Sequence, residues 1–153
     1  MRLTVYTEYT LRTLMYLGCN RDRLVTVQDI ADLHHISKNH LMKIVYHLGV
    51  SGVVETVRGR NGGLRLRSAP EDINIGAVIR KTESDFFIVE CFDQEHNACV
   101  LTPFCRLKGL LRRATDAFLN TLDSVTLAEL IDEKNSAIQR PEKSQPPRPS
   151  KSK

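Results

Sequence analysis

Apolar and polar positions in the first fifty residues follow the spacing of three short helices. In the first segment, apolar side chains recur three and four positions apart, at Leu11, Leu14, Met15 and Leu17. This spacing predicts a helix with one buried face, with Thr7 as its N-cap and with Gly18 and Asn20 at its end.

Two further helices are predicted after a short loop. Thr26 and Asp29 have the spacing of a capping pair at the start of the second helix, and Ser37 is a suitable N-cap for the third. Residues 34–36 interrupt the helical pattern between them. The third helix has one apolar stripe, formed by Leu41, Ile44, Val45 and Leu48. Gly49 predicts its C-terminal end, since glycine readily adopts the left-handed conformation found there.

The pattern then changes from helical to strand periodicity. Residues 53–57 are mostly β-branched, and residues 64–67 alternate strictly between leucine and arginine, so both segments are predicted strands. Asn61 and Gly62 lie between them. Because both residue types tolerate positive φ, this pair predicts a tight hairpin turn.

Two more helices follow the hairpin. Asn74 is the predicted N-cap of a helix over residues 75–83, and Thr102 is the predicted N-cap of the longest helix, with Pro103 at its first position. The apolar stripe of this last helix is formed by Phe104, Leu107, Leu110, Leu111, Ala114, Phe118, Leu119 and Leu122. So wide a stripe exceeds what a neighbour within this small chain could cover, which predicts a partner helix from a second subunit.

In chain order, these elements predict a mainly α fold with a small β-hairpin. Two short helices joined by a tight break, followed by an arginine-rich hairpin, have the arrangement of a winged helix-turn-helix. We therefore expect a winged helix-turn-helix DNA-binding domain over residues 1–80 and a long C-terminal dimerisation helix within residues 81–135. Residues 136–153 are rich in proline, serine and lysine, a composition that predicts a disordered basic tail.

A winged helix-turn-helix domain reads base edges with the early residues of the second helix of its pair. The predicted DNA contacts are Lys38, Asn39, His40 and Lys43 on that helix and Arg58, Arg60 and Asn61 on the wing. Asparagine suits bidentate contacts with adenine, and wing arginines suit the backbone or a narrow minor groove. The predicted partner is therefore double-stranded DNA, in the form of a palindromic operator bound by a homodimer.

The distribution of charge agrees with this interpretation. The formal net charge of +4 divides into +4 over residues 1–80, −4 over residues 81–135 and +4 over residues 136–153. A local basic cluster such as the wing arginines favours a polyanionic partner. No apolar run approaches the roughly 18 residues that a membrane span needs, and the chain start lacks the apolar stretch of a signal peptide. We therefore expect a cytoplasmic protein without membrane association.

Three of the four cysteines lie close together in the sequence. Cys91, Cys99 and Cys105 follow the pattern C-x7-C-x5-C, whereas Cys19 stands at the end of the first helix and is interpreted as structural. A cytoplasmic location disfavours disulfides, and a structural zinc site usually has two cysteines two to four residues apart. The spacing alone leaves open three inert thiols or the ligands of an iron–sulfur cluster.

Two further residues bear on the cluster interpretation. With Thr102 as N-cap, Cys105 falls in the first turn of the long helix, where the helix dipole favours the thiolate that binds metal. Three cysteines leave an iron centre one ligand short. His96, between Cys91 and Cys99, is one candidate for the missing ligand.

Four segments of the chain carry a family resemblance: MRLTVYTEYTLRTLMYL, ISKNHLMKIVYHLG, VETVRGRNGGLRL and the cysteine region ECF…C…TPFCRLKGLLRRA. Together they resemble the IscR/NsrR family of bacterial winged-helix regulators over roughly residues 1–132. The resemblance implies a homodimer with one iron–sulfur cluster per subunit, of the 2Fe–2S or 4Fe–4S type. It implies that the metal ligands in residues 81–135 are Cys91, Cys99 and Cys105. It also implies a fourth ligand from the other subunit, an acidic residue early in the first helix, and Glu8 holds that position.

One departure from the family pattern bears on the signal that is sensed. IscR-like members have a histidine three residues after the last cysteine, where this chain has Lys108, so the resemblance favours the nitric-oxide-sensing type. The implied function is a repressor that releases its operator when nitric oxide reaches the cluster and so derepresses nitrosative-stress genes. A repressor of the same family that responds to iron or cluster status, and a metal-free thiol redox switch, stay open as alternatives. No nucleophile–base pair or phosphate-binding loop stands out, so an enzyme is not expected.

Overall fold

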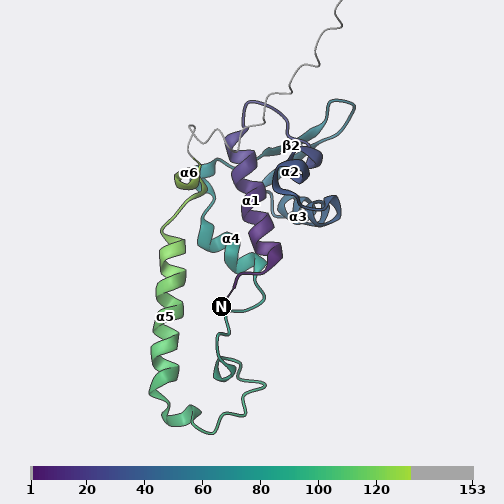
Figure 1. Cartoon of the computed structure of the whole chain (residues 1–153). Helices are drawn as coiled ribbons and strands as arrows, with labels where there is room; N and C mark the ends of the chain where they lie inside the picture. Colours follow the sequence, from purple (N-terminus) through teal and green to yellow (C-terminus); the bar gives the residue numbers. More distant parts are fainter. Residues whose placement is uncertain (1, 132–153) are drawn as a thin grey trace, which may run out of the picture.

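The computed structural model describes residues 2–131, which form helices packed around one central helix (Figure 1). The helices are α1 (Val5–Cys19), α2 (Val27–His34), α3 (Lys38–Val50), α4 (Ile75–Thr82), α5 (Arg106–Asp123) and α6 (Leu127–Leu130). The strands are β1 (Val54–Val57) and β2 (Gly63–Leu66), and the 3-10 helices are η1 (Pro70–Asp72), η2 (Glu90–Phe92) and η3 (Thr102–Phe104). The mainly α fold with a small hairpin is confirmed, while the predicted tail over residues 136–153 lies outside the described residues.

The core surrounds α1, which lies between the hairpin, α2 and α3 on one side and α4 on the other (Figure 1). Its fully buried apolar side chains include Leu14, Leu17, Ile30, Leu41, Ile44, Ile79 and Leu127. These residues come from α1, α2, α3, α4 and α6, so the apolar stripes predicted for the first three helices meet in one core. In contrast, α5 runs beside α4 and extends away from this body (Figure 1).

The first helix begins earlier than predicted. Thr4 is its N-cap, because its hydroxyl accepts a hydrogen bond from the backbone N–H of Thr7 at 3.2 Å. Thr7 lies inside the helix, where its buried hydroxyl donates to Thr82 Oγ1 on α4 at 2.9 Å. The prediction of Thr7 as N-cap was therefore wrong, since a threonine used for packing between helices resembles a capping one in sequence. At the other end Asn20 is the C-cap as predicted, whereas Gly18 lies within the helix.

The second and third helices begin at the positions that their capping residues predicted. Thr26 and Asp29 form a reciprocal capping box on α2, and the Ser37 hydroxyl accepts a hydrogen bond from the N–H of His40 in α3. Between the two helices the chain turns at His35, which has a left-handed φ of 54°. These two helices and the turn form the predicted helix-turn-helix.

The third helix continues past its predicted end at Gly49. It extends to Val50, and the left-handed residue that follows is Gly52, with a φ of 76°. The N–H of Gly52 donates to the Gly49 carbonyl and the N–H of Val53 donates to the Leu48 carbonyl, each at 3.0 Å. This pair of bonds is a Schellman motif, which requires the left-handed residue at position 52 rather than 49.

The hairpin turn differs from the prediction in its geometry. Asn61 and Gly62 both have negative or extended φ, and the left-handed residue of the loop over residues 58–62 is Gly59, with a φ of 116°. Gly62 is required for another reason, since a Cβ atom there would lie 2.2 Å from the carbonyl oxygen of Val57. The loop does contain a tight turn, over residues 59–62 and closed by a hydrogen bond from the Gly62 N–H to the Gly59 carbonyl at 3.0 Å, but the turn is not centred on Asn61 and Gly62 as predicted.

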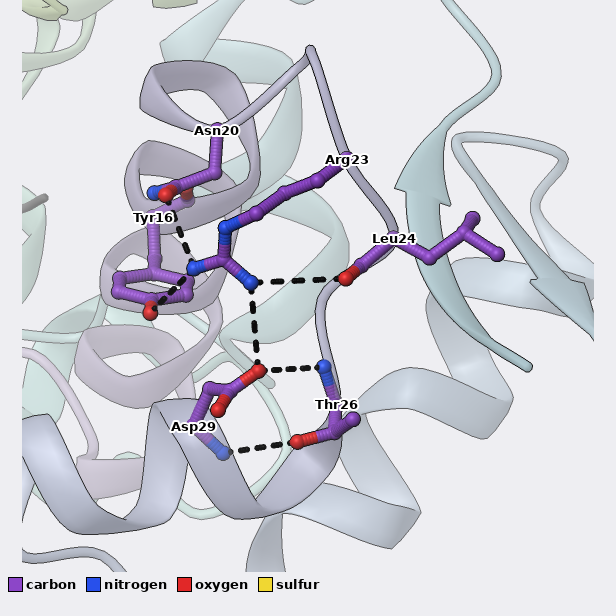
Figure 2. Close-up of polar contacts among 6 residues, drawn as sticks. All are labelled: Tyr16, Asn20, Arg23, Leu24, Thr26 and Asp29. Atoms are coloured by element: carbon purple, nitrogen blue, oxygen red, sulfur yellow. Dashed lines mark hydrogen bonds and ion pairs between the residues drawn. The ribbon is translucent and has the colours of Figure 1, made fainter. Parts of the chain in front are cut away.

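Arg23 joins the end of α1 to the start of α2 (Figure 2). Its guanidinium donates to the Tyr16 hydroxyl at 3.1 Å and to Asn20 Oδ1 at 3.0 Å. It also donates to the Asp29 carboxylate at 3.4 Å, and that carboxylate accepts the backbone N–H of Thr26 at 3.0 Å. One arginine therefore connects α1 to the capping box of α2 and helps to hold the first two helices at a defined angle.

The same contacts keep Asp29 charged. Burial alone would raise the pKa of this carboxyl, but the hydrogen bonds from Thr26 and Arg23 outweigh it and hold the pKa below its usual value. The contribution of Asp29 to stability is therefore present above the pKa of the unfolded chain and is lost as the pH falls through the lower pKa of the folded chain.

The remaining helices follow the hairpin. Asn74 caps α4 as predicted, because its side chain accepts the N–H of Ala77 at 2.9 Å. After α5 the chain returns to the body, where the N–H of Leu127 donates to the Ile73 carbonyl at 2.8 Å. Over residues 2–131, none of the helices combines the length and the apolar character that crossing a bilayer requires.

Replacing Arg23 by Met should lower the free energy of unfolding by about 1–3 kcal/mol, because several buried or half-buried polar groups lose a shared donor. Urea unfolding of the full chain, followed by circular dichroism, measures this change. Arg21→Met, at an exposed position of the same loop, is the matched control and should change the free energy by less than about 0.5 kcal/mol. Equal effects of the two substitutions would contradict the role assigned to Arg23.

Candidate DNA-binding surface and cysteine loop

The predicted contacts on the third helix gather on its exposed side. Lys38, Asn39, His40 and Lys43 are all exposed and lie in the first two turns of α3. The ring of His40 lies near that of Tyr9 on α1, with the ring centroids 6.2 Å apart. The opposite side of α3 is buried in the core, so this helix presents the four polar side chains from a fixed position.

The exposed side of α3 also carries apolar side chains that the periodicity did not single out. Met42, Tyr46 and Val50 are 56%, 68% and 71% exposed. Apolar side chains of a recognition helix can contact the methyl group of thymine. Their signal in the sequence is that they are apolar, yet fall outside the buried stripe of the same helix.

The predicted wing residues lie at the tip of the hairpin. Arg58, Arg60 and Asn61 are exposed, and the two arginines form no ion pair within residues 2–131. Arg65 differs, because its Nε lies 2.9 Å from Glu55 Oε2 on the paired strand, and this contact lowers the pKa of Glu55. The two arginines at the tip of the wing therefore have their positive charge available to a polyanion, whereas that of Arg65 is offset by Glu55.

The three clustered cysteines lie in the segment between α4 and α5. Cys91 is buried within η2, whereas Cys99 and Cys105 are half-buried, and all three are free thiols. Within the part of the chain that the structure describes, no three histidine, cysteine, aspartate or glutamate side chains are gathered so that they could hold a metal ion. The single chain therefore supplies three thiols in one loop without bringing them together.

Polar contacts within this loop hold its present shape. The Glu90 carboxylate accepts the N–H of Ala98 at 2.6 Å. Asn97 accepts the N–H of Cys99 at 3.1 Å and donates to the Thr102 hydroxyl at 3.1 Å. These bonds link the residues on either side of Cys99, so a change in the position of its thiol requires them to rearrange.

The start of the long helix differs from the prediction. Thr102 and Pro103 begin the separate 3-10 helix η3, and the N-cap of α5 is Cys105 itself. The Cys105 sulfur accepts the backbone N–H of Lys108 at 3.4 Å. The prediction of Thr102 as N-cap was wrong because Pro103 also suits the start of a 3-10 turn. Cys105 consequently lies one position before the helix rather than in its first turn.

The two predicted candidates for a fourth ligand have other partners in this chain. Glu8 lies exposed in the first turn of α1 and forms an ion pair with Arg12. His96 is exposed, and its Nδ1 lies 2.7 Å from Asp93 Oδ2. A hydrogen bond with His96 lowers the pKa of Asp93. Within residues 2–131, neither candidate forms a metal-binding group with the cysteines.

A cation–π contact joins the cysteine loop to α5. The Arg112 guanidinium lies 4.7 Å from the centre of the Phe92 ring, which is buried next to Cys91. Such a cation–π contact stabilises modestly, and more where it is partly shielded from water. The loop is thus attached to the long helix at two points, Phe92 and Cys105.

The chain is similar to known regulators along most of its length. Residues 3–133 match the Rrf2 family, which is described as an iron-dependent transcriptional regulator. The HTH-type transcriptional regulator NsrR of Bacillus licheniformis is 57% identical over 132 residues, which cover 86% of this chain and 92% of that protein. The HTH-type transcriptional regulator NsrR of Bacillus subtilis is 52% identical over 139 residues, which cover 90% of this chain and 95% of that protein.

A solved structure has the same winged-helix fold. CymR, the global cysteine regulator of Bacillus subtilis, superposes with a TM-score of 0.69 at 28% identity, covering 85% of this chain and 95% of that one. The helix-turn-helix, the wing and the long helix described above therefore have their counterparts in regulators of transcription. This chain belongs to the Rrf2 family of transcriptional regulators, and it is not an enzyme.

Proposed function

We propose that this chain is a cytoplasmic, homodimeric repressor that binds a palindromic operator and releases it when nitric oxide reaches an iron–sulfur cluster. The observation that carries the proposal is that Cys105, the last of three neighbouring cysteines, is itself the N-cap of α5. A change at the cysteine loop therefore acts directly on the start of the helix that we expect to set the geometry of the dimer.

The proposed DNA contacts are those of the exposed side of α3 and the tip of the wing. Lys38, Asn39, His40 and Lys43 face the major groove in this arrangement, and Arg58, Arg60 and Asn61 contact the backbone or the minor groove. In a symmetric dimer the two recognition helices fit half-sites about 34 Å apart, or a multiple of that distance. Operator affinity then depends on the spacing that the two subunits impose.

The long helix supports the proposed dimer. Of the side chains on α5, only that of Thr115 is buried, while Leu107 and Leu110 are 58% and 53% exposed. Removing such apolar surface from water is the main driving force for association. A second copy of α5 offers an apolar stripe of matching width.

The chemistry of the donor set supports the proposed cluster, one in each subunit. Cys91, Cys99 and Cys105 are free thiols in one loop, and cysteine thiolates are the usual ligands of iron–sulfur clusters. We propose that these three residues hold a 2Fe–2S or 4Fe–4S cluster, with Glu8 of the second subunit as the fourth ligand. When bound, the cluster supplies iron with which nitric oxide reacts.

The loop supplies the two states that a switch needs. Because the three thiols are not gathered in the described residues, holding them around one centre requires the loop to change its shape. The contacts of Glu90 and Asn97 favour the present shape, and ligation favours the other. The signal can shift operator occupancy only by the difference between the DNA affinities of the two states.

A repressor that responds to iron status is the second candidate, favoured by the description of the family as iron-dependent. It uses the same three cysteines and the same DNA surface. The two candidates differ in the event that empties or alters the site, which is depletion of iron in one case and reaction with nitric oxide in the other.

Nitric oxide should release the cluster-loaded protein from DNA at a few equivalents per cluster. The measurement is fluorescence anisotropy under anaerobic conditions, with a DNA duplex selected from a random pool by the loaded protein. Release only after iron is chelated would support the iron-status candidate instead. Absence of iron, sulfide and visible absorption after strictly anaerobic purification would support a metal-free thiol switch.

Replacing Cys99 by Ser should abolish the visible absorption of the anaerobically isolated protein, because the loop loses one of three thiolate ligands. Iron and sulfide contents per subunit check the result, and size-exclusion chromatography should show that the chain still dimerises. Cys19→Ser, at the end of α1, is the control and should retain iron and colour. Full iron content in the Cys99 variant would remove this residue from the proposed ligands.

Replacing Arg60 by Ala should weaken DNA binding and reduce the slope of log affinity against log salt by about 1, because one phosphate contact is lost. Iron content should be unchanged, since the wing lies outside the cysteine loop. Arg113→Ala, an exposed position of α5, removes the same charge elsewhere and is the matched control. Unchanged affinity and salt dependence in the Arg60 variant would refute the wing assignment.

A further inference from the structure

Helix α4 is bonded at its C-terminal end to the start of α1. The Thr82 hydroxyl accepts a hydrogen bond from the buried Thr7 hydroxyl at 2.9 Å. Next to it, Glu83 Oε1 accepts the N–H of Thr4 at 2.8 Å and its hydroxyl at 3.0 Å. The first turn of α1, which also contains Glu8, is therefore attached to the end of α4.

Helix α4 and its N-cap are bonded to the last residue of α5, Asp123. The Arg80 guanidinium makes two bonds with the Asp123 carboxylate, one of them between Nη2 and Oδ2 at 2.8 Å. The side-chain amide of Asn74 donates to the backbone carbonyl of Asp123 at 2.6 Å. We refer to Asn74, Gly76, Arg80 and Asp123 as the Asp123 clamp.

Gly76 shows how closely the two helices approach in this clamp. A Cβ atom at Gly76 would lie 2.0 Å from Asp123 Oδ1 and 2.8 Å from its backbone nitrogen. No side chain other than hydrogen fits without displacement of α5. Gly76 and Arg80 are four residues apart and thus lie on one side of α4, so the Asp123 carboxylate is held along a full helical turn.

The clamp fixes the orientation of α5 relative to α4, which the neighbouring backbone hydrogen bond does not. The N–H of Ile75 donates to the Val125 carbonyl at 3.0 Å, which holds the chain after α5 at one point. Most of α5 is exposed, and α4 is the helix against which it packs. The bidentate geometry of Arg80 with Asp123 restrains orientation as well as distance, so it sets the angle at which α5 leaves α4.

We propose that the Asp123 clamp is the joint through which the state of the cysteine loop reaches the DNA-binding helices. This inference rests on the proposed function. The loop determines the position of Cys105 and the start of α5, and the clamp converts the direction of α5 into the position of α4. Through Thr82 and Glu83, α4 then positions α1, against which α3 packs. In a dimer, the clamp thereby links each loop to the spacing of the recognition helices.

The ion pair of the clamp is too exposed to contribute much to the stability of the fold, so its role lies in the orientation of the two helices. The side chains of Arg80 and Asp123 are 40% and 39% exposed, and ion pairs this accessible to water contribute little to overall stability. Loss of the ion pair should therefore leave the fold intact and alter mainly the coupling between α5 and α1.

The test compares the affinity of the cluster-loaded and cluster-free forms for one DNA duplex, selected from a random pool by the loaded wild type. The ratio of the two affinities is the coupling between loop and DNA surface. Asp123→Asn keeps the size of the side chain and the backbone carbonyl, but loses the charge. We expect it to reduce the ratio by about 3-fold to 10-fold, with unchanged iron content, cluster-free affinity and thermal midpoint.

Further variants separate a joint from a structural contact. Arg80→Gln should reduce the ratio as Asp123→Asn does, and the double variant should lose no more, because both remove one shared interaction. Arg80→Lys keeps the charge and should retain most of the ratio. Asp116 is exposed and lies on the same side of α5 as Asp123, seven residues earlier. Asp116→Asn is therefore the matched control and should behave as wild type.

The outcomes distinguish this inference from the function on which it rests. A wild-type ratio of 1 would overturn the proposed function and the role of the clamp together. A wild-type ratio above 1 that Asp123→Asn and Arg80→Gln leave unchanged would overturn the clamp alone. Equal weakening of DNA binding in the loaded and cluster-free forms, or a lowered thermal midpoint without a change in the ratio, would assign the clamp a purely structural role.

Discussion

The burial of α1 at the centre of the molecule is the constraint on which the other elements depend. This helix packs against α2, α3, α4, α6 and β2, so it is buried on several sides. Thr7, Thr10 and Thr13 are buried along it, and a buried hydroxyl must find a partner. Thr10 and Thr13 donate to carbonyl oxygens four residues earlier at 2.8 Å, and Thr7 donates to α4. Neighbouring helices can therefore approach α1 closely without leaving polar groups unsatisfied.

The proposed DNA-binding surface and the cysteine loop lie at opposite ends of a series of packed helices. The exposed side of α3 and the tip of the wing carry positive side chains in a segment of net positive charge, and the cysteine loop lies in the segment of net negative charge. Separation of this kind keeps a DNA polyanion away from the thiols. It also requires a mechanical connection, and α4 makes direct contacts with both α1 and α5.

Local sequence patterns predicted those features that depend only on residues a few positions apart. The capping residues Thr26, Asp29, Ser37 and Asn74 act as expected, because each bond joins a side chain to a backbone group three residues away. The predictions for Thr7 and Thr102 failed where another element or another turn type used the same residue. The prediction that Asn61 and Gly62 form the centre of the turn was also wrong. At Gly62, the close approach of the backbone to the Val57 carbonyl requires glycine, rather than a positive φ.

The sequence by itself determined the helix-turn-helix, the arginine-bearing wing, the surplus apolar stripe of the long helix and the spacing of the cysteines, because periodicity and short spacings are local properties. Only the tertiary structure decided that Thr7 on α1 bonds to Thr82 on α4 and that Asp123 lies against Gly76. The physical reason is that these contacts join groups whose separation along the chain is unrelated to their separation in space. Arg80 and Asp123 are 43 residues apart in sequence and form one ion pair, which no local pattern can specify.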